Sequence, residues 1–244
     1  MKGAFIAVDW GTTNRRCYLI ESDGRAVRSK SDDRGILRLS GNDYAREVHA
    51  IREWFGDLPM LCAGMVGSNR GWHEIPYVEA PADLQAIAAH AAWVDLGIAI
   101  LPGVSLTVAD RADVMRGEEV QFLGAVAACL VPPAALLCQP GTHCKWAWTS
   151  AGILHEFTTA MTGELFALLK NHSLLSGHLD GSVVDGAAFQ EGVVNASQHD
   201  LLASLFSVRA ANLLGRRREQ DMATYSVSDC VGNCQTCAPA GAGG

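Results

Sequence analysis

The sequence predicts an α/β fold made of two related halves. Short apolar runs of strand length alternate along the chain with amphipathic segments such as residues 43–55, where apolar side chains recur at helical spacing. A hairpin pattern at residues 4–20 consists of an apolar run, a Gly-Thr turn and an alternating run. The same pattern returns at residues 135–148. Two copies of one design, far apart in the chain, indicate two halves of common architecture.

The first turn has the chemistry of a phosphate-binding loop. Asp9 ends the first apolar run, and Gly11, Thr12, Thr13 and Asn14 follow it. Backbone N–H groups and Thr hydroxyls in such a turn bind phosphate oxygens, and a carboxylate at the end of the strand binds magnesium. The alternative is an ordinary hairpin whose polar side chains satisfy their own backbone. The second copy of the turn favours the phosphate interpretation.

The second turn contains Gly141 and Thr142, which we expect to contact phosphate through backbone N–H groups and a hydroxyl. Lys145 follows and is a candidate for neutralising the charge of the transferred group. The alternative for Lys145 is the solvent face of a strand, because it alternates with Trp146 and Trp148. With one turn in each half, we expect both turns to bind the same nucleotide.

Five motifs carry a resemblance to a known family. They are DWGTTN at residues 9–14, GMVGS at 64–68, MRGEE at 115–119, PGTHCKW at 140–146 and MTGEL at 161–165. Together they resemble the 2-dehydro-3-deoxygalactonokinase family of sugar kinases over roughly residues 1 to 214. The resemblance implies an actin/hexokinase-like (ribonuclease H-like) two-lobed kinase that uses ATP and Mg²⁺.

The loop after the predicted strand 58–63 has the parts for binding a sugar acid, and the resemblance places it on the substrate side. Glycines permit close approach of the backbone, polar side chains bind hydroxyls, and an arginine binds a carboxylate. The residues are Gly67, Ser68, Asn69 and Arg70. For Arg70 the alternative is an exposed side chain in a glycine-rich connection.

Three carboxylates are candidates for the base that takes the proton of the substrate hydroxyl: Glu118, Glu119 and Asp110. Phosphoryl transfer to an alcohol needs one such base. Adjacent residues on a helix face different directions, so at most one of the two Glu is the base, and Glu118 is preferred. The alternative is that both Glu only favour the helix dipole, and that Asp110 binds magnesium or caps a turn.

Composition limits the partners. The chain has 244 residues, 49% of them hydrophobic, and a net charge of -7, which argues against nucleic acid. The dense basic run at residues 216–218 is interpreted as solvated. The longest apolar stretch, residues 125–138, is broken by Pro132-Pro133, so no membrane span is expected. The cysteines in apolar patterns indicate reduced thiols and a cytoplasmic protein. A homo-oligomer is left open.

We expect an N-terminal lobe at residues 1–133, a partial C-terminal lobe at 134–214 and a disordered, atypical tail at 215–244. Helices are also predicted at 81–94, from Thr162, and at 185–194 and 199–214. In the tail, residues 230, 234 and 237 have the spacing C-x3-C-x2-C, which can hold a metal or cluster. A fourth ligand is missing nearby, so we interpret the tail as irregular and the second lobe as incomplete.

These observations predict ATP-dependent phosphorylation of the terminal hydroxyl of 2-dehydro-3-deoxy-D-galactonate, a step of galactonate catabolism. The substrate is implied by the resemblance alone. Two alternatives stand beside it. One is an impaired relative that binds the sugar acid without turnover, and the other is a module that binds metal through the cysteines of the tail.

Overall fold

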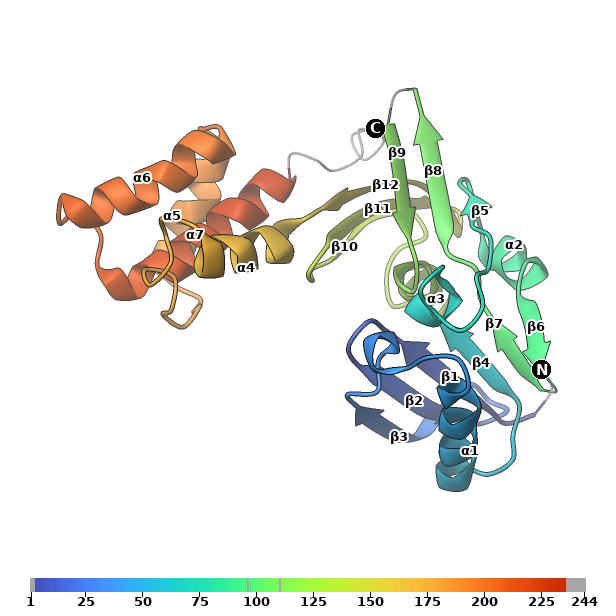
Figure 1. The fold of residues 1–244 in the computed structure, drawn as a ribbon. Coiled ribbons are helices and arrows are strands. Elements are labelled where there is room, and N and C mark those ends of the chain that lie inside the picture. Colours follow the sequence, from blue (N-terminus) through green and yellow to red (C-terminus); the bar gives the residue numbers. More distant parts are fainter. Residues whose placement is uncertain (1–2, 96, 110, 236–244) are drawn as a thin grey trace. The chain divides into compact units, whose positions relative to one another are not determined.

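A computed structural model describes residues 3–95, 97–109 and 111–235, with side chains up to residue 232 (Figure 1). The chain divides into two compact units. Unit 1 comprises residues 1–135 and 149–156, and unit 2 comprises residues 136–148 and 157–244. The first division lies close to the predicted one after residue 133. The return of residues 149–156 to unit 1 was not predicted.

Unit 1 is built on a six-stranded sheet in the order β3-β2-β1-β4-β7-β6. Its strands are β1 (Phe5–Trp10), β2 (Arg15–Ile20), β3 (Ala26–Asp32), β4 (Met60–Ala63), β6 (Ala92–Asp95) and β7 (Ile98–Ile100). β1 pairs antiparallel with β2 and parallel with β4. Because parallel strands run in one direction, the carboxyl ends of β1 and β4 meet at the same edge, where Asp9 pairs with Ala63.

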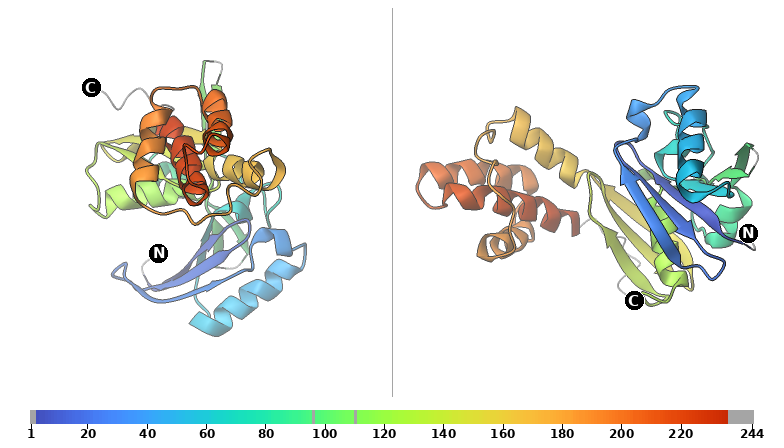
Figure 2. Two further views of the ribbon diagram at one scale, coloured as in Figure 1. Left: turned by 90° about the vertical axis from the view of Figure 1, so that its left-hand side faces the viewer. Right: turned by 90° about the horizontal axis from the view of Figure 1, so that it is seen from below.

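Helix α1 (Asp43–Phe55) covers one face of this sheet (Figure 2) and has the predicted boundaries. Tyr44, Val48, Ile51 and Phe55 lie on its buried side, at spacings of three and four residues. Gly56 ends the helix with φ of 101°, a conformation that glycine adopts without strain. The burial of each large apolar side chain contributes about 1.5–3 kcal/mol to folding.

The rest of unit 1 contains a smaller sheet and two helices. The sheet has the order β5-β8-β9, with β5 (Val78–Glu79), β8 (Val104–Val108) and β9 (Arg111–Met115). The helices are α2 (Leu84–Ala89) and α3 (Glu118–Ala127), and two short 3-10 turns are η1 (Ile36–Arg38) and η2 (Met65–Gly67). These elements carry the loops that surround the edge of the larger sheet.

The predicted helix at residues 81–94 is wrong in its second half. Helix α2 is short, and Asp83 caps it by accepting a hydrogen bond from the Ala86 N–H at 2.8 Å. Residues 92–95 instead form β6, which pairs antiparallel with β7. The alanine-rich segment favours a helix locally, but pairing with a buried neighbour strand outweighs that propensity.

A three-stranded sheet contains the second hairpin. Its order is β10-β11-β12, with β10 (Ala135–Gln139), β11 (Cys144–Ser150) and β12 (Ile153–Ala160). The helices of unit 2 are α4 (Thr162–His172), α5 (Ala187–Ala196), α6 (Leu201–Leu213) and α7 (Glu219–Gln235). The predictions of a helix starting at Thr162 and of helices at residues 185–194 and 199–214 are therefore confirmed within a few residues.

The prediction of a disordered tail from residue 215 is wrong for residues 219–235, which form α7. Met222, Ala223 and Tyr225 are buried, and Met222 and Tyr225 belong to the core of unit 2. α7 packs closely on α5: a Cβ added at Gly192 would lie 1.9 Å from the Ser228 Oγ. The absence of a side chain at Gly192 therefore allows the two helices to approach each other.

The apolar periodicity of α7 is weak because polar side chains are buried along it. Asp229 is fully buried and accepts hydrogen bonds from Ser204 Oγ at 2.6 Å and from Asn195 Nδ2 at 3.1 Å. Thr224 donates to the Ser182 carbonyl oxygen at 3.2 Å. Polar groups with partners can be buried without a large cost. A prediction based on the spacing of apolar residues therefore misses this helix.

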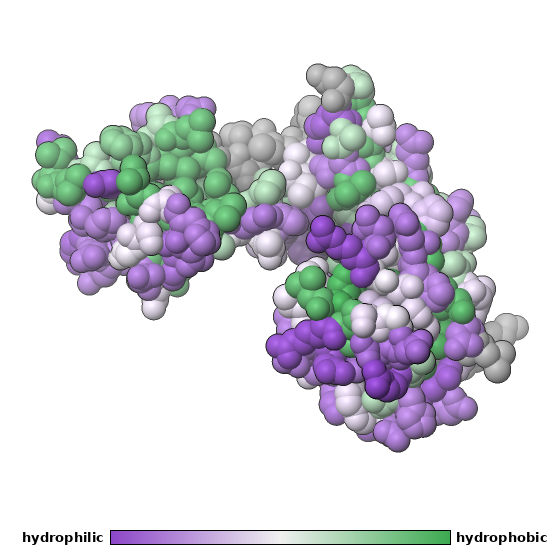
Figure 3. Space-filling model, in the orientation of Figure 1, coloured by the Kyte–Doolittle hydropathy of each residue, from purple (hydrophilic) through white to green (hydrophobic). Residues whose placement is uncertain are grey.

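Large apolar side chains are exposed on α6, and Figure 3 shows the apolar surface over this helix. Leu202, for example, is 78% exposed and Phe206 is 65% exposed. Within the described residues, none of the helices is both long and apolar enough to cross a membrane.

We predict that Met222→Ala destabilises the protein by about 2–5 kcal/mol, because it leaves a cavity in the core of unit 2. The exposed Leu202 provides the control: Leu202→Ala should change stability by less than about 0.5 kcal/mol. Urea denaturation monitored by circular dichroism measures both. Equal, small effects would show that α7 does not pack as described.

Candidate active site

The first Gly-Thr turn, residues 11–14, is held from behind by another backbone segment. The N–H groups of residues 35, 36 and 37 donate to the carbonyl oxygens of residues 13, 11 and 12 at 3.0–3.1 Å. A Cβ at Gly35 would lie 2.3 Å from the Thr13 carbonyl carbon, so only glycine fits there. Thr12, Thr13 and Asn14 are exposed. The turn thus directs its carbonyls inward and leaves the predicted phosphate-binding side chains accessible.

A buried ion network beside this turn was missed by the sequence analysis. The Arg15 side chain is fully buried and pairs with Asp32 at 2.7 Å and Glu47 at 2.8 Å. Arg34 also pairs with Glu47. The Trp10 ring lies 5.1 Å from the Arg15 Cζ. In the sequence Arg15 is one of two adjacent arginines at a strand start, and its partners are remote, so no local pattern identifies it.

Asp9 lies where three backbone segments meet. Gly64 has φ of 94°, and a Cβ there would lie 2.9 Å from the Trp10 carbonyl oxygen and 3.5 Å from the Asp9 Oδ1. Gly117 has φ of 112°, and its Cβ would lie 3.2 Å from the Gly64 Cα. Both positions favour glycine on conformational and steric grounds. The close approach brings the amino end of α3 to the Asp9 carboxylate.

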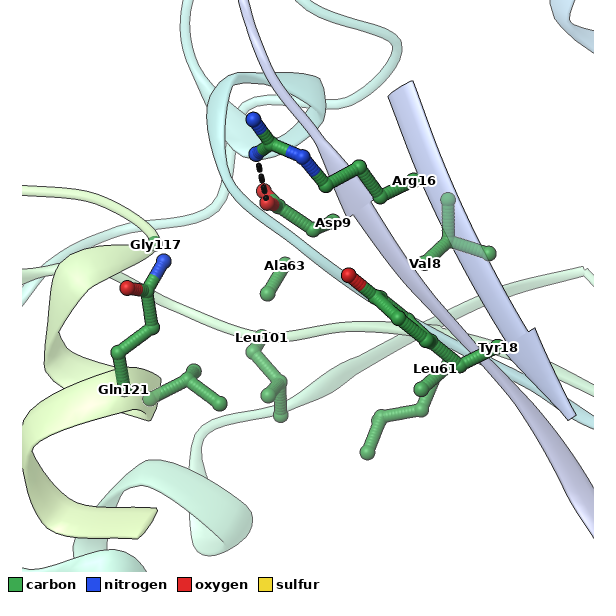
Figure 4. Close-up of a pocket in the computed structure, with 11 residues that line it drawn as sticks. Val8, Asp9, Arg16, Tyr18, Leu61, Ala63, Leu101, Gly117 and Gln121 are labelled. Atoms are coloured by element: carbon green, nitrogen blue, oxygen red, sulfur yellow. Dashed lines mark hydrogen bonds and ion pairs between the residues drawn. The ribbon is translucent and has the colours of Figure 1, made fainter. Parts of the chain in front are cut away.

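A cavity of about 450 Å³ opens at this place (Figure 4). Asp9 forms an ion pair with Arg16 at 3.0 Å on its wall, and Gln121 contributes from α3. Apolar side chains supply most of the remaining wall. The lining residues are Ala7, Val8, Asp9, Arg16, Tyr18, Leu61, Ala63, Leu101, Gly117, Val120 and Gln121. The cavity therefore combines one carboxylate and one cation with a mainly apolar surround.

The two adjacent glutamates at the start of α3 have different environments. Glu118 is half-buried, and its Oε2 accepts the Arg116 backbone N–H at 3.0 Å. Glu119 is fully buried, and its Oε2 accepts the Gly117 N–H at 2.7 Å. Burial raises the pKa of Glu119 to about 8. Glu119 is closed off from solvent, whereas the half-buried Glu118 is accessible to a substrate hydroxyl, so the preference for Glu118 is kept as a proposal. Asp110 lies outside the described residues.

The predicted sugar-acid loop follows β4 and contains η2. Gly67 and Ser68 are buried, while Asn69 and Arg70 are exposed. The Ser68 hydroxyl donates to the Met65 carbonyl oxygen at 2.7 Å and accepts the Arg70 N–H at 3.3 Å. Ser68 therefore holds the shape of the loop, and the two residues after it present their side chains to solvent.

The second Gly-Thr turn rests on the amino end of α4. The Glu164 N–H donates to the Thr142 carbonyl oxygen at 3.0 Å, and a Cβ at Gly163 would lie 2.6 Å from the Gly141 carbonyl oxygen. His143 pairs with the Glu164 side chain at 2.5 Å. Gly141 and Thr142 are exposed, as is Thr12 of the first turn.

Lys145 does not lie on the solvent face of its strand, so that alternative is wrong. Its side chain is buried, and Nζ donates to the Thr159 Oγ1 of β12 at 2.6 Å. At the start of α4, Met161 is the N-cap residue. The Thr162 hydroxyl donates to the Ala160 carbonyl oxygen at 3.3 Å. The MTGEL motif instead supplies Gly163 and Glu164, which contact the turn.

An apolar cavity of about 220 Å³ adjoins the second turn within unit 2. It is lined by residues of the turn, of the start of α4 and of α7, namely Cys138, Pro140, Gly141, Cys144, Thr162, Gly163, Phe166, Val227, Cys230 and Val231. The second turn therefore borders a cavity within unit 2, and the side chains of residues 12–14 in the first turn are exposed in unit 1. That both turns bind one nucleotide stays a prediction.

The tail cysteines show no metal site within the described residues. Cys230 is a buried thiol in α7, and the side chains of residues 234 and 237 lie outside the described part. No group of three or more His, Cys, Asp or Glu side chains with metal-binding geometry occurs where the structure describes the chain.

Comparison with known proteins supplies the family. The family model described as 2-keto-3-deoxy-galactonokinase matches residues 9–230. The chain belongs to this family. It is 36% identical over 228 residues to the 2-dehydro-3-deoxygalactonokinase of Escherichia coli (strain K12), covering 92% of this chain and 77% of that protein. A protein of Rhizobium meliloti (strain 1021), named as a probable enzyme of the same kind, is 37% identical over 227 residues, with 87% and 72% covered.

A solved structure agrees. The crystal structure of a candidate 2-dehydro-3-deoxygalactonokinase from Sinorhizobium meliloti superimposes with a TM-score of 0.87 at 35% sequence identity, covering 98% of this chain and 83% of that one. The predicted α/β fold of the actin and hexokinase type is confirmed, as is membership of a kinase family. All five motifs quoted above lie within or overlap the matched residues.

We predict that the stability of this family member falls with rising pH because of Glu119. Its pKa in the folded protein, about 8, exceeds the ordinary value of 4.5, so the folded state holds a proton that the unfolded chain has released. The stability due to this proton is full below pH 4.5 and is lost as the pH rises through 8.

Glu119→Gln should therefore lose less stability between pH 6 and pH 9 than the unmodified protein does. Thermal unfolding at several pH values measures the difference. The control is Glu79→Gln, at an exposed position of β5, which should follow the unmodified protein. Parallel pH profiles for Glu119→Gln and the unmodified protein would contradict the assignment.

Proposed function

We propose that this protein transfers the terminal phosphoryl group of ATP to the terminal hydroxyl of 2-dehydro-3-deoxy-D-galactonate. The observation that carries the proposal is that Asp9 and the start of α3 border one cavity, with the Gly-Thr-Thr-Asn turn directly after β1, in a chain that belongs to the 2-keto-3-deoxy-galactonokinase family. Galactonate catabolism in the cytoplasm is part of the proposal. The alternative of a relative without turnover gains no support from the comparisons.

Asp9 is the proposed ligand of Mg²⁺, and its surroundings fit that role. Its carboxylate is 34% exposed on the cavity wall, and magnesium usually takes one or two carboxylates together with phosphate oxygens and waters. Arg16, 54% exposed, pairs with Asp9 and is free to swing into solvent when a cation takes its place. When bound, the ion neutralises charge that develops on the transferred group.

The two Gly-Thr turns are the proposed contacts for the phosphate groups. In the first, Thr12, Thr13 and Asn14 present hydroxyls and an amide to solvent, and Gly11 closes the turn by donating its N–H to the Asn14 carbonyl oxygen at 2.9 Å. In the second, Gly141 and Thr142 are exposed on a turn that rests on the amino end of α4. Lys145, buried beneath this turn, contributes positive charge without direct exposure.

Glu118 is the proposed base. It precedes the body of α3 and its carboxylate is only half-buried, so a hydroxyl can reach it. Accepting the hydroxyl proton as the new O–P bond forms raises the nucleophilicity of the substrate oxygen. Glu119 is proposed to stay protonated beside it. The loop with Gly67, Ser68, Asn69 and Arg70 is proposed to bind the sugar acid, with Ser68 acting through the loop conformation.

We expect Asp9→Asn to abolish phosphorylation of the sugar acid while leaving the melting temperature nearly unchanged, because Asp9 is partly exposed and its ion pair is weak in water. A coupled assay of ADP release and thermal unfolding measure the two effects. The matched control, Asp23→Asn in an exposed turn, should keep full activity. Full activity of Asp9→Asn would refute the role of this carboxylate.

Thr12→Val should raise the KM for ATP by about tenfold, because a hydroxyl hydrogen bond to a charged phosphate is lost at constant side-chain size. Thr142→Val should do the same if the second turn has the same role. The KM for the sugar acid should hardly change. Thr107→Val, at an exposed position near the end of β8, is the control. Steady-state kinetics decide, and an unchanged KM for ATP in both variants would count against phosphate binding by the turns.

A further inference from the structure

Arg116 is a buried cation whose hydrogen-bonding capacity is only partly used. Its side chain is 9% exposed. Nη2 donates to the Ile75 carbonyl oxygen at 2.8 Å, and the guanidinium lies over the Tyr77 ring with Cζ 4.2 Å from the centroid. Nε and Nη1 are buried and have no hydrogen-bond partner among the described residues. Buried N–H groups of a cation that have no acceptor destabilise the folded protein, so their presence calls for a functional explanation.

No acidic side chain compensates for Arg116 in the described residues. The positive charge of Arg116 acts to lower the pKa of Glu119, and burial outweighs this effect. The two side chains form no ion pair. Glu119 also has a buried oxygen, Oε1, without a partner. A buried guanidinium without an anion is the arrangement expected of a binding site whose anion arrives with a ligand.

Arg116 also has the right neighbours. Nη1 lies against the backbone of Gly67, where an added Cβ would be 3.0 Å away. Gly67 belongs to the proposed sugar-acid loop. The Arg116 backbone N–H donates to Glu118 Oε2 at 3.0 Å, so the backbone of this residue contacts the proposed base. The cation, the loop and the base are thus parts of one local structure in unit 1.

We propose that Arg116 binds the carboxylate of the sugar acid and that Arg70 is not the residue that recognises it. This inference rests on the function proposed above. Arg70 is exposed, and a charge-assisted hydrogen bond is weak where water competes for both groups. At Arg116 the same bond forms in a buried place, next to an aromatic face, where it discriminates strongly between a charged and a neutral ligand.

Ligand entry requires a local shift. Nε and Nη1 are covered, and the backbone at Gly67 lies against Nη1. The carboxylate therefore reaches the guanidinium when η2 and the exposed residues after it move away from Arg116. The close packing at Gly67 gives a second position at which the interaction can be disturbed without touching the arginine.

The test compares the sugar acid with its neutral C1 carboxamide. Binding is measured by calorimetry and turnover by the coupled assay. The unmodified protein should prefer the acid strongly. Arg116→Gln should lower kcat/KM for the acid about 10- to 100-fold, as expected for loss of a charged hydrogen bond, and should leave the amide and the KM for ATP nearly unaffected. Arg25→Gln, on an exposed turn, is the matched control.

Three results would overturn the proposal. Equal losses for acid and amide in Arg116→Gln would show a purely structural role. Loss of discrimination in Arg70→Gln but not in Arg116→Gln would assign the carboxylate to Arg70. Equal binding of acid and amide by the unmodified protein would remove the carboxylate site altogether. Binding of the acid without phosphorylation would refute the kinase function alone, because discrimination is then still read from calorimetry.

Gly67→Ala covers the case in which Arg116→Gln does not fold. The new methyl group would lie 3.0 Å from Nη1 and 3.0 Å from the Ile100 Cγ2, so it crowds the guanidinium from the side of the loop. We expect reduced discrimination between acid and amide in this variant as well. Retained discrimination in a folded Gly67→Ala protein would contradict the proposed position of the carboxylate.

Discussion

The close approach of three backbone segments at the carboxyl end of β1 is the constraint on which the site depends. Gly64 lies against the Trp10 carbonyl, and Gly117 lies against Gly64. A side chain at either glycine would separate β4, α3 and β1. With these contacts, Asp9 and the start of α3 border one cavity. The glycines of the GMVGS and MRGEE motifs thus set the geometry around Asp9, and Asp9 and Glu118 are the carboxylates proposed to act there.

Each Gly-Thr turn is supported by a different structure, although the two turns are similar in sequence. In the first, the N–H groups of residues 35–37 donate hydrogen bonds to the carbonyl oxygens of the turn. The buried Arg15 network stabilises the adjoining strand. In the second, the amino end of α4 takes that place, with Glu164 holding both the turn backbone and His143. In both turns the Thr side chains at positions 12 and 142 are exposed, and their backbone carbonyls accept hydrogen bonds from the supporting segment.

Polar burial recurs in both units and has different consequences. In unit 2, Asp229 is buried with hydrogen bonds from Ser204 and Asn195, so it stabilises the packing of α7. In unit 1, Glu119 and Arg116 are buried with atoms that have no partner. Ser226 Oγ in unit 2 also lacks a partner, so what distinguishes Arg116 is its position beside Gly67 of the proposed sugar-acid loop and beside Glu118.

The sequence by itself determined the α/β class, the two hairpins, the helix at 43–55 and the family, because these depend on local periodicity, turn residues and contiguous motifs. Tertiary structure decided the rest. Residues 92–95 became a strand through pairing with β7, and α7 formed from a segment that buries small and polar residues beside Met222 and Tyr225. The side-chain hydrogen bonds of Arg15 and Arg116 go to partners 17 to 41 residues away, and no local pattern encodes such contacts.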